Sequence, residues 1–286
     1  MSRYIVSLIC AVIFCSAFSV YVPNPLITRS SPVVTIPPRP KDAISGSEFA
    51  LLTSTMTAEE RQKVAVDELI RGNIPDFLRT LHPVYLSYDG PDSQLLKATV
   101  WVMSDYLAIG SNHDFLRIPL SLHSALSVLS YYKGVPPTCK IVDAIYSQSN
   151  IHLKPQPLPP GSQMSSSLYY LRHQRMIEKQ RGEQELGVLT AGHKKDVVIS
   201  NRLINHSGRI AIYGWHRSNE DPIQPLSTVH REGYEDYSHG IRFVSQTVLI
   251  NGKPKSLIDL LQDPKSAPLL SYEGSIQKID KILHIN

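Results

Sequence analysis

The chain has 286 residues and a formal net charge of +4, and 42% of its residues are hydrophobic while 19% are charged. This length suits one large or two small domains, and the composition excludes a wholly disordered chain. The charge is too mild, and Lys and Arg are too dispersed, to indicate a nucleic-acid-binding protein. Three cysteines are too few for a disulfide scaffold.

The first residues have the layout of a secretory signal peptide. Arg3 precedes an apolar stretch over 4–14, and Ala17 and Ser19 are small residues placed for cleavage after Ser19. A retained membrane anchor is the alternative, but an anchor needs about 20 apolar residues and this run is shorter. We therefore expect residues 1–19 to be removed, leaving a secreted protein, extracellular or periplasmic, with no stable membrane span.

Residues 20–42 are dense in proline, and they include Pro23, Pro25, Pro32, Pro37, Pro38 and Pro40. Proline at this density blocks both helices and strand ladders, so this stretch is expected to be an extended arm or linker. No internal repeat and no second linker of this kind follows. Residues 43–286 are therefore predicted to form one compact domain.

Helix signals begin soon after the arm. Thr57 and Glu60 form a capping box, with apolar residues at helical spacing behind it. The pattern predicts a helix that stops at Gly72. A strand-like stretch follows over 99–103 and continues over 106–109.

Three more helices are expected, over 122–132, 139–147 and 165–181. Ser121 caps the first of them and Gly134 closes it, while Gly182 ends the last. Between the second and third, the proline-rich stretch 153–161 is expected to be a loop.

The C-terminal half changes to strand signals. Three segments alternate or run apolar with β-branched residues, over 194–200, 209–215 and 241–250. Asn251-Gly252 is a type I′ turn signal. Helices in the N-terminal half followed by a mainly antiparallel sheet in the C-terminal half predict an α+β fold.

The first two of those strands predict a polar cluster. If their hairpin is symmetric about the loop 201–208, then His193 faces His216 across the ladder. Period-2 alternation places Lys195 on the face of His193, opposite Gly214. The other face is expected to be an outer surface, and it carries Lys194, Asp196, Tyr213 and Trp215.

Two other segments could join this rim of the core. His239 and Tyr237 precede the third strand, with Arg242 close behind, and Asp114 lies in a turn before Arg117. The candidate catalytic residues are therefore His216, His239, His193, Lys195 and Asp114. The candidate ligand-binding residues are Arg242, Arg117, Trp215 and Tyr237, with packing as the alternative role for Trp215.

Two kinds of chemistry fit these residues. The candidate zinc ligands are His193, His216 and His239, with Asp114 as a possible fourth ligand, although the sequence has no HExxH spacing. Without a metal, His216 or His239 would act as a general base, and Lys195 or Arg242 would stabilise developing negative charge. For each histidine the alternative is a structural, hydrogen-bonded residue.

Three other features call for an interpretation. Cys139 remains alone after cleavage and is expected to be a buried structural residue. Asn205-His206-Ser207 is a glycosylation sequon, which has meaning only in a eukaryotic secretory pathway. The long helix carries a basic face. The simplest interpretation is that water solvates this face, and the alternative is that an anionic surface or ligand covers it. That face is made of Arg172, His173, Arg175, Lys179 and Arg181.

Several longer segments carry a resemblance. They are DYLAIG over 105–110, DFLRIP over 114–119, KIVDAIY over 140–146, GHKKDVV over 192–198, AIYGWH over 211–216 and DYSHGIR over 236–242. On these segments the chain resembles, over about residues 50–275, a family of secreted, mostly bacterial proteins that has no established activity. The resemblance implies a single domain, and it assigns no catalytic role.

Two functional hypotheses follow, together with a third in which the protein is structural and has no site. The first is a secreted hydrolase that acts on an extracellular or cell-wall polymer through the histidine-rich rim. The second is a non-catalytic module that binds a small anionic ligand through Lys195, Arg242 and Arg117.

Overall fold

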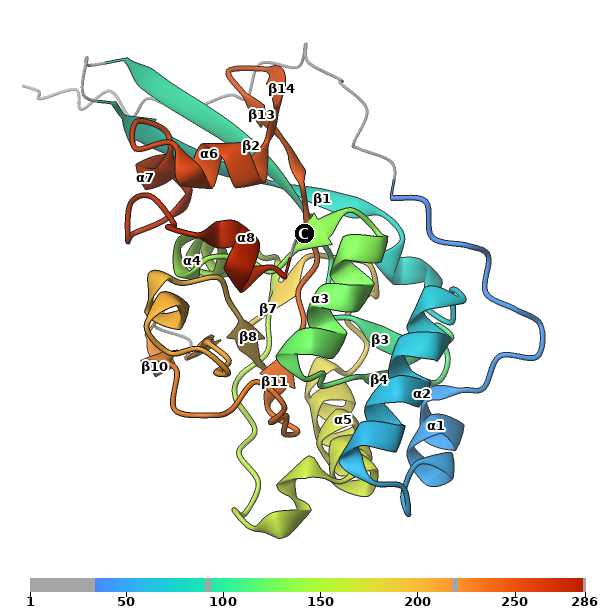
Figure 1. Ribbon diagram of the computed structural model, residues 1–286. Helices are drawn as coiled ribbons and strands as arrows, with labels where there is room; N and C mark the ends of the chain where they lie inside the picture. Colours follow the sequence, from blue (N-terminus) through green and yellow to red (C-terminus); the bar gives the residue numbers. More distant parts are fainter. Residues whose placement is uncertain (1–33, 91–93, 218–220, 285–286) are drawn as a thin grey trace, which may run out of the picture.

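A computed structural model describes residues 34–90, 94–217 and 221–284 (Figure 1). The predicted signal peptide and the first part of the proline-rich arm lie outside these residues. Residues 34–42, the rest of the arm, form no helix or strand and lie against the body. Arg79 donates to the carbonyl oxygens of Ile36 and Pro37, and Arg39 donates to that of Gly110.

The first two helices begin with capping boxes. The Ser45 hydroxyl accepts from the Glu48 amide at the start of α1 (Gly46–Leu52). Thr57 and Glu60 form the predicted box at the start of α2 (Ala58–Ile70). Each box satisfies backbone amides that a helix start leaves without a partner.

The larger sheet is formed around β2 (Leu95–Met103), which pairs along its length with β1 (Leu81–Asp89). The strand order is β14-β13-β2-β12-β5, with β1 as the sixth strand. The other four strands are β5 (Gly134–Val135), β12 (Val244–Ser245), β13 (Thr247–Ile250) and β14 (Lys253–Ser256). Asn251 and Gly252 both have positive φ between β13 and β14, so the predicted hairpin turn is confirmed.

The smaller sheet has the order β10-β9-β8-β11. Its strands are β8 (Lys195–Val197), β9 (Ile212–His216), β10 (Pro222–Ser227) and β11 (His239–Gly240). Lys195 pairs with Gly214 and Asp196 with Tyr213, which is the predicted hairpin register. The predicted third strand is interrupted, because its residues are divided among β11, β12 and β13.

Three longer helices lie where the sequence predicts them, and they are α3 (Leu122–Tyr131), α4 (Cys139–Gln148) and α5 (Ser167–Arg181). The prediction that Gly134 closes α3 is wrong, since Lys133 adopts the left-handed conformation there, with φ 58°. Gly134 lies in β5 instead. A Cβ at this position would sit 2.1 Å from Cε2 of Phe243, so close packing excludes a side chain.

Short elements complete the fold. They are β3 (Ala108–Gly110), β4 (Phe115–Arg117), β6 (Ile151–His152), β7 (Thr190–Ala191), α6 (Leu257–Gln262), α7 (Ala267–Leu270), α8 (Ile279–Ile282) and the 3-10 turns η1 (Asp76–Leu78), η2 (Ser162–Ser165) and η3 (Asn201–Ile204). In Figure 1, β1 and β2 lie at the top, α1 to α3 at the lower right and β8 to β10 at the lower left. Among the described residues, no helix is both long and apolar enough to cross a membrane.

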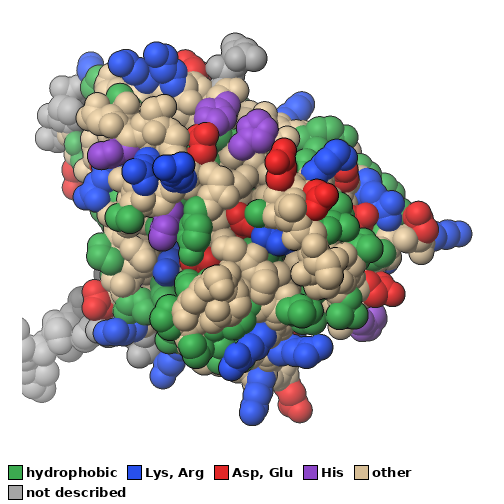
Figure 2. Space-filling model, turned by 60° about the horizontal axis from the view of Figure 1, so that its bottom comes forward, with side chains coloured by type: hydrophobic (Ala, Val, Ile, Leu, Met, Phe, Trp, Pro, Cys, Tyr) green, Lys and Arg blue, Asp and Glu red, His purple; other side chains and the backbone are tan. Residues whose placement is uncertain are grey.

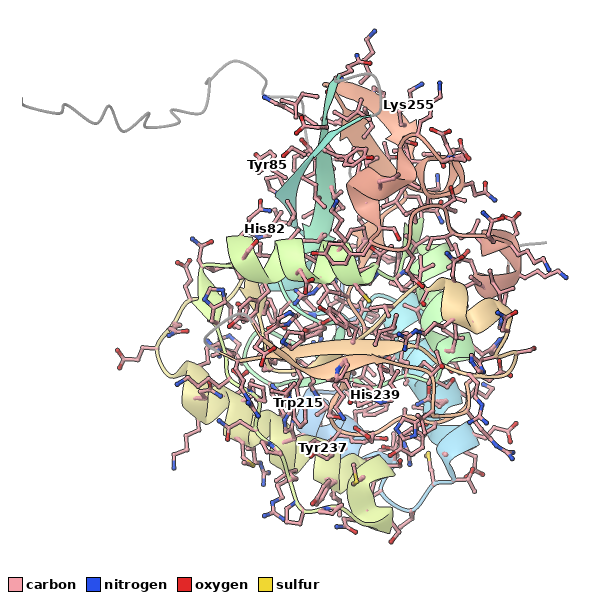
Figure 3. The ribbon with its side chains drawn as sticks, turned by 90° about the vertical axis from the view of Figure 1, so that its left-hand side faces the viewer. His82, Tyr85, Trp215, Tyr237, His239 and Lys255 are labelled. Atoms are coloured by element: carbon pink, nitrogen blue, oxygen red, sulfur yellow. The ribbon has the colours of Figure 1, made fainter. Side chains whose placement is uncertain are left out.

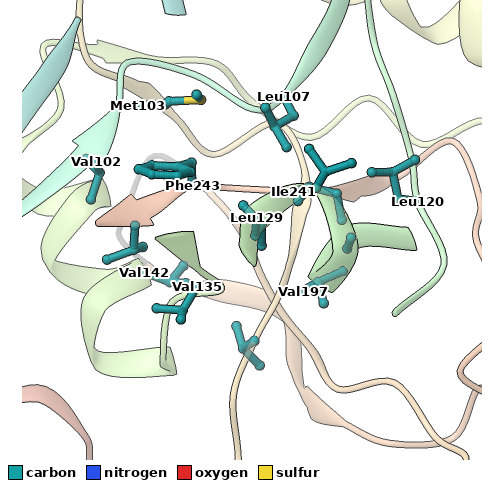
Figure 4. Close-up of a cluster of buried hydrophobic side chains, with 14 of the residues drawn as sticks. Val102, Met103, Leu107, Leu120, Leu129, Val135, Val142, Val197, Ile241 and Phe243 are labelled. Carbon is teal, nitrogen blue, oxygen red and sulfur yellow. The ribbon is translucent and has the colours of Figure 1, made fainter. Parts of the chain in front are cut away.

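One hydrophobic core joins these parts. Its buried side chains run from Ile36 to Leu283 and come from helices and from both larger sheets. Figure 4 shows Val102 of β2, Val135 of β5 and Val197 of β8 together with Phe243 in this cluster. The architecture is therefore the predicted α+β fold, with mainly antiparallel sheets and most of the longer helices early in the chain.

Candidate functional site

Strand β8 and the bend before it carry four consecutive polar residues, His193 to Asp196, into the protein. Lys195 is half-buried, and the other three are buried. In the sheet, Lys195 lies between Gly214 of β9 and His239 of β11. Because paired residues on neighbouring strands point to the same face, Lys195 and His239 lie side by side.

We call the group around these two residues the rim cluster, and it consists of Lys195, Trp215, His230, Tyr234, Asp236 and His239. The Lys195 ammonium lies 4.8 Å from the centre of the Trp215 ring. Behind His239, an Asp236 carboxylate oxygen lies 3.9 Å from Nε2 of the imidazole. Figure 3 shows Trp215 and His239 near each other in the lower half of the molecule, with Tyr237 close by.

The Asp236 carboxylate is held in place by its neighbours. The Ser238 amide and hydroxyl donate to one of its oxygens at 2.7 and 2.5 Å, and the Tyr234 hydroxyl donates to the other at 3.1 Å. Burial alone would raise the pKa of Asp236, but His239 and the Ser238 donors outweigh it and lower the pKa. Asp236 is therefore an ionised carboxylate in a fixed orientation, and both the amide and the hydroxyl of Ser238 are used to hold it.

His239 is a neutral imidazole beside that carboxylate. Burial lowers its pKa, against the opposing effect of Asp236, and among the described residues neither ring nitrogen has a hydrogen-bond partner. Burial also lowers the pKa of Lys195. Within the described part of the chain no carboxylate lies within ion-pair distance of Lys195. The pair thus offers a free base and a free cation.

Two aromatic rings cover His239. The His230 and Tyr234 rings stack with centroids 4.2 Å apart, and the Tyr234 ring meets His239 edge-on at 5.7 Å. Both covering side chains are half-buried, whereas His239 is buried. A hollow of about 620 Å³ adjoins this stack, and its lining includes Tyr234, Arg209, Arg231 and Glu232. A ligand would therefore approach His239 past two arginines and a stacked aromatic pair.

A second, largely buried cluster lies around His193. Its imidazole Nε2 is 3.2 Å from Asp105, whose other oxygen accepts from Arg117 at 2.6 and 3.0 Å. Arg117 also donates to Glu178 at 2.7 Å. Burial would raise the pKa of Asp105, but Arg117 and His193 outweigh it and hold the pKa well below its usual value. Burial lowers the pKa of His193 to about 4.

The two arginines predicted to bind a ligand instead interact with other residues of the protein. Arg117 is engaged as described above, and its side chain is 1% exposed. Arg242 lies with its guanidinium 4.1 Å from the centre of the Tyr106 ring, and it donates to the carbonyl oxygens of Met103 and Thr190. Both residues therefore stabilise the interior, and neither reaches the rim cluster.

The prediction that Lys194, Asp196 and Trp215 face outward is wrong, since all three are buried. Strand β8 is an inner strand, and Tyr106 covers its second face. Burial lowers the pKa of Lys194 to about 7, and its ammonium donates to the Tyr237 carbonyl. Burial raises the pKa of Asp196 to about 6, and Asp196 accepts from the Tyr106 hydroxyl at 2.8 Å.

The predicted meeting of His193 and His216 is also wrong, although the strand register is right. Nε2 of His216 lies 2.9 Å from Asp143, and its ring stacks on Tyr146 at 4.5 Å. The rings belong to different clusters because extended alternation stops before it reaches them. Gly192 (φ 100°) bends one strand, and Gly214 and Trp215 (φ 106° and 58°) bend the other.

Asp114 and Tyr237 have local roles. The Asp114 carboxylate accepts from the Ser47 amide at 2.9 Å and from the Ser47 hydroxyl, which fixes the first turn of α1. The Tyr237 hydroxyl accepts from the Leu158 amide at 2.8 Å. Within the described residues no three His, Cys, Asp or Glu side chains gather as a metal site would require. His193, His216 and His239 are therefore not brought together as zinc ligands.

Two further expectations can be compared with the structure. Cys139 is a half-buried free thiol, and burial raises its pKa to about 12, so it is a poor nucleophile. His173 does not belong to a solvated basic face: it is fully buried, and burial lowers its pKa.

Sequence reasoning missed His230, Tyr234, Asp236 and Asp143. Asp236 begins the segment DYSHGIR, where its position three residues before His239 was a usable signal. The other three come from loops and a helix far from β8 in sequence, so only the fold brings them to the histidines.

No family model matches the chain, and neither a curated protein nor a solved structure matches it. The functional conclusion therefore rests on the side chains described above.

Proposed function

We propose that the protein is a secreted hydrolase in which His239 is the general base, the nearby Asp236 carboxylate stabilises the imidazolium that forms and Lys195 stabilises negative charge. The observation that carries this proposal is the side-by-side placement of Lys195 and His239 on neighbouring strands, with ionised Asp236 behind the imidazole. A neutral imidazole beside a fixed carboxylate is the arrangement that general-base catalysis needs.

The proposed reaction is hydrolysis of an amide or ester bond. Neutral His239 removes a proton from water as the oxygen attacks the carbonyl carbon, and the ammonium of Lys195 stabilises the resulting oxyanion. The imidazolium then returns the proton to the leaving group. Glycoside hydrolysis is disfavoured because it needs two facing carboxylates, whereas the rim cluster has only Asp236.

The expected substrate is an extracellular or cell-wall polymer that carries negative charge. Secretion is supported by the signal-like layout of the first residues in the sequence. Negative charge on the substrate is supported by Arg209 and Arg231, which outnumber Glu232 among the charged residues that line the hollow beside the aromatic pair. Access to His239 requires this pair to move aside, because it covers the imidazole.

The test uses purified bacterial cell-wall peptidoglycan, with release of new amino groups as the readout. His239→Asn keeps the size of the ring site but removes the base, and it should lower the rate at least about 100-fold. Asp236→Asn should lower it less, because it removes only the charge that stabilises the imidazolium. His206→Asn, at an exposed loop position, is the matched control and should keep the wild-type rate. Full activity in His239→Asn would overturn the assignment.

Secretion has its own test. Mass spectrometry of the protein recovered from the culture medium or periplasm should find a chain that begins at Val20. An intact Met1 in a cell-associated protein would contradict the proposed export.

The second candidate function is a non-catalytic module that binds a small anion. It is favoured by one observation: Lys195 lies over Trp215 with no carboxylate partner among the described residues. Calorimetry with citrate as the probe would then show salt-sensitive binding that Lys195→Met abolishes, without any product from peptidoglycan. Product formation that depends on His239 would exclude this candidate.

A further inference from the structure

Helix α5 presents a mixed apolar and basic stripe to the outside. The stripe contains Leu168, Leu171, Arg172, Arg175, Met176 and Lys179, whose spacing of three and four residues places them on one side of a helix. The opposite side of α5 buries His173, Gln174 and Ile177 in the protein. Lys179 lies eleven residues after Leu168, so the stripe is about 16 Å long.

The apolar part of this stripe has no covering element among the described residues. Leu168 is 51% exposed, and Leu51 of α1, beside it, is 62% exposed. Together they border a shallow hollow of about 480 Å³ whose floor includes the buried Leu171. These two leucines line this hollow together with Leu171, Met176, Arg172, Arg175 and Lys179, and a contiguous apolar patch with a polar rim marks an interaction surface.

The basic part carries charge that the protein does not neutralise. Within the described residues, none of Arg172, Arg175 and Lys179 has a carboxylate at ion-pair distance, whereas the neighbouring Arg181 is paired with Glu178. Arg172 lies against the Tyr169 ring at 5.7 Å. On the face of the molecule that Figure 2 shows, Lys and Arg side chains lie next to hydrophobic ones at the lower edge, with an acidic side chain among them.

We propose that this surface binds the headgroup region of a membrane that contains anionic lipids. Arg172, Arg175 and Lys179 would meet lipid phosphates, and Leu51 and Leu168 would enter the acyl boundary. A single small anion could not reach three cations spread along this stripe, whereas a bilayer presents many phosphates at once. The protein would therefore work at a membrane surface.

The experiment is co-sedimentation with vesicles. The chain that begins at Val20 is used, because residues 1–19 are themselves apolar and the described body lies wholly within the shorter chain. Vesicles of phosphatidylcholine with 30% phosphatidylglycerol, as a stated composition, are compared with vesicles of phosphatidylcholine alone. We expect at least tenfold stronger binding to the anionic vesicles and a loss of that difference at high salt.

Two triple variants remove the same number of positive charges, so a comparison between them distinguishes the contribution of this surface from that of the protein's net charge. R172Q/R175Q/K179Q should weaken binding about 100-fold, given the effect of each cation near a membrane. The control K253Q/K255Q/K265Q removes three exposed lysines elsewhere and should change binding by less than about threefold. The double variant Leu51→Ser, Leu168→Ser should also weaken binding to the anionic vesicles, while the salt dependence of that binding stays as in the wild type.

Several outcomes would overturn the proposal. They are equal binding to both kinds of vesicle, equal losses in the two triple variants, and binding to polyglutamate without binding to vesicles, which would indicate an acidic protein partner. Thermal unfolding of each variant confirms that it is folded. Hydrolysis of peptidoglycan in solution does not depend on this surface, so the two proposals can fail separately.

Discussion

The buried amine of Lys194 makes a quantitative prediction about stability. Burial and the nearby charge of Arg117 lower its pKa from 10.5 to about 7. Between these two values the unfolded chain keeps the proton that the folded chain has lost. Because the unfolded state then binds more protons, the free energy of unfolding should rise as pH rises through this window. Lys194→Met removes the titrating group and should remove this rise.

The size of the rise follows from the two pKa values. Between pH 7 and pH 9 the wild type should gain about 2 kcal/mol of unfolding free energy relative to Lys194→Met. The acidic neighbours Asp105 and Asp236 keep their charge in this range, since the pKa of each is lowered. Titration of the Cys139 thiol in the unfolded chain affects both proteins equally and cancels in the difference.

Urea unfolding at pH 7, 8 and 9, followed by far-UV circular dichroism, measures the effect. Lys255→Met, at an exposed position, is the control and should keep the wild-type slope. If the wild type and Lys194→Met change in parallel with pH, then Lys194 is not a buried amine of lowered pKa. The enclosed geometry described around β8 would then be wrong.

Three other predictions concern packing, anchoring and reactivity. Gly240→Ala should lower the unfolding free energy by about 1–3 kcal/mol, because its Cβ would lie 2.5 Å from a Tyr106 ring carbon. The control Gly233→Ala, whose Cβ would lie in open space, should leave it unchanged. Equal urea midpoints for the two variants would contradict this prediction. Arg79→Ala should lower the unfolding free energy by about 2 kcal/mol, since the guanidinium donates to four backbone carbonyls, and an unchanged melting temperature would refute the anchoring role. Alkylation of Cys139 at pH 8, followed by peptide mass spectrometry, should be at least about 100-fold slower in the folded than in the unfolded protein; similar rates would show that the thiol is not protected.

Local signals predicted the local structure well. The capping box at Thr57 and the turn at Asn251 depend on hydrogen bonds and dihedral angles within a few residues, so the sequence contains all that they require. The register of β8 and β9 also followed from the sequence, because the two strands pair symmetrically about the connection that contains η3. Strand β1 was missed, since its identity depends on pairing with β2.

The candidate site was only partly predictable. Lys195 and His239 were named from the sequence, and the fold places them side by side. Asp236 was visible in the same segment but was given no role. His193 and His216 were named for a meeting that does not occur, because a one-residue bend at Gly192 or Gly214 redirects a side chain and leaves no clear mark in the pattern.

The sequence by itself determined where helices begin, where the hairpin turns and which residues carry chemistry, because these depend on neighbours along the chain. Only the tertiary structure decided that Lys194 is buried, that Arg117 and Arg242 serve the interior, and that His230 and Tyr234 cover His239. Burial and contact depend on residues brought from distant segments, and the free energy of placing a charge or a ring depends on that surrounding rather than on its sequence neighbours.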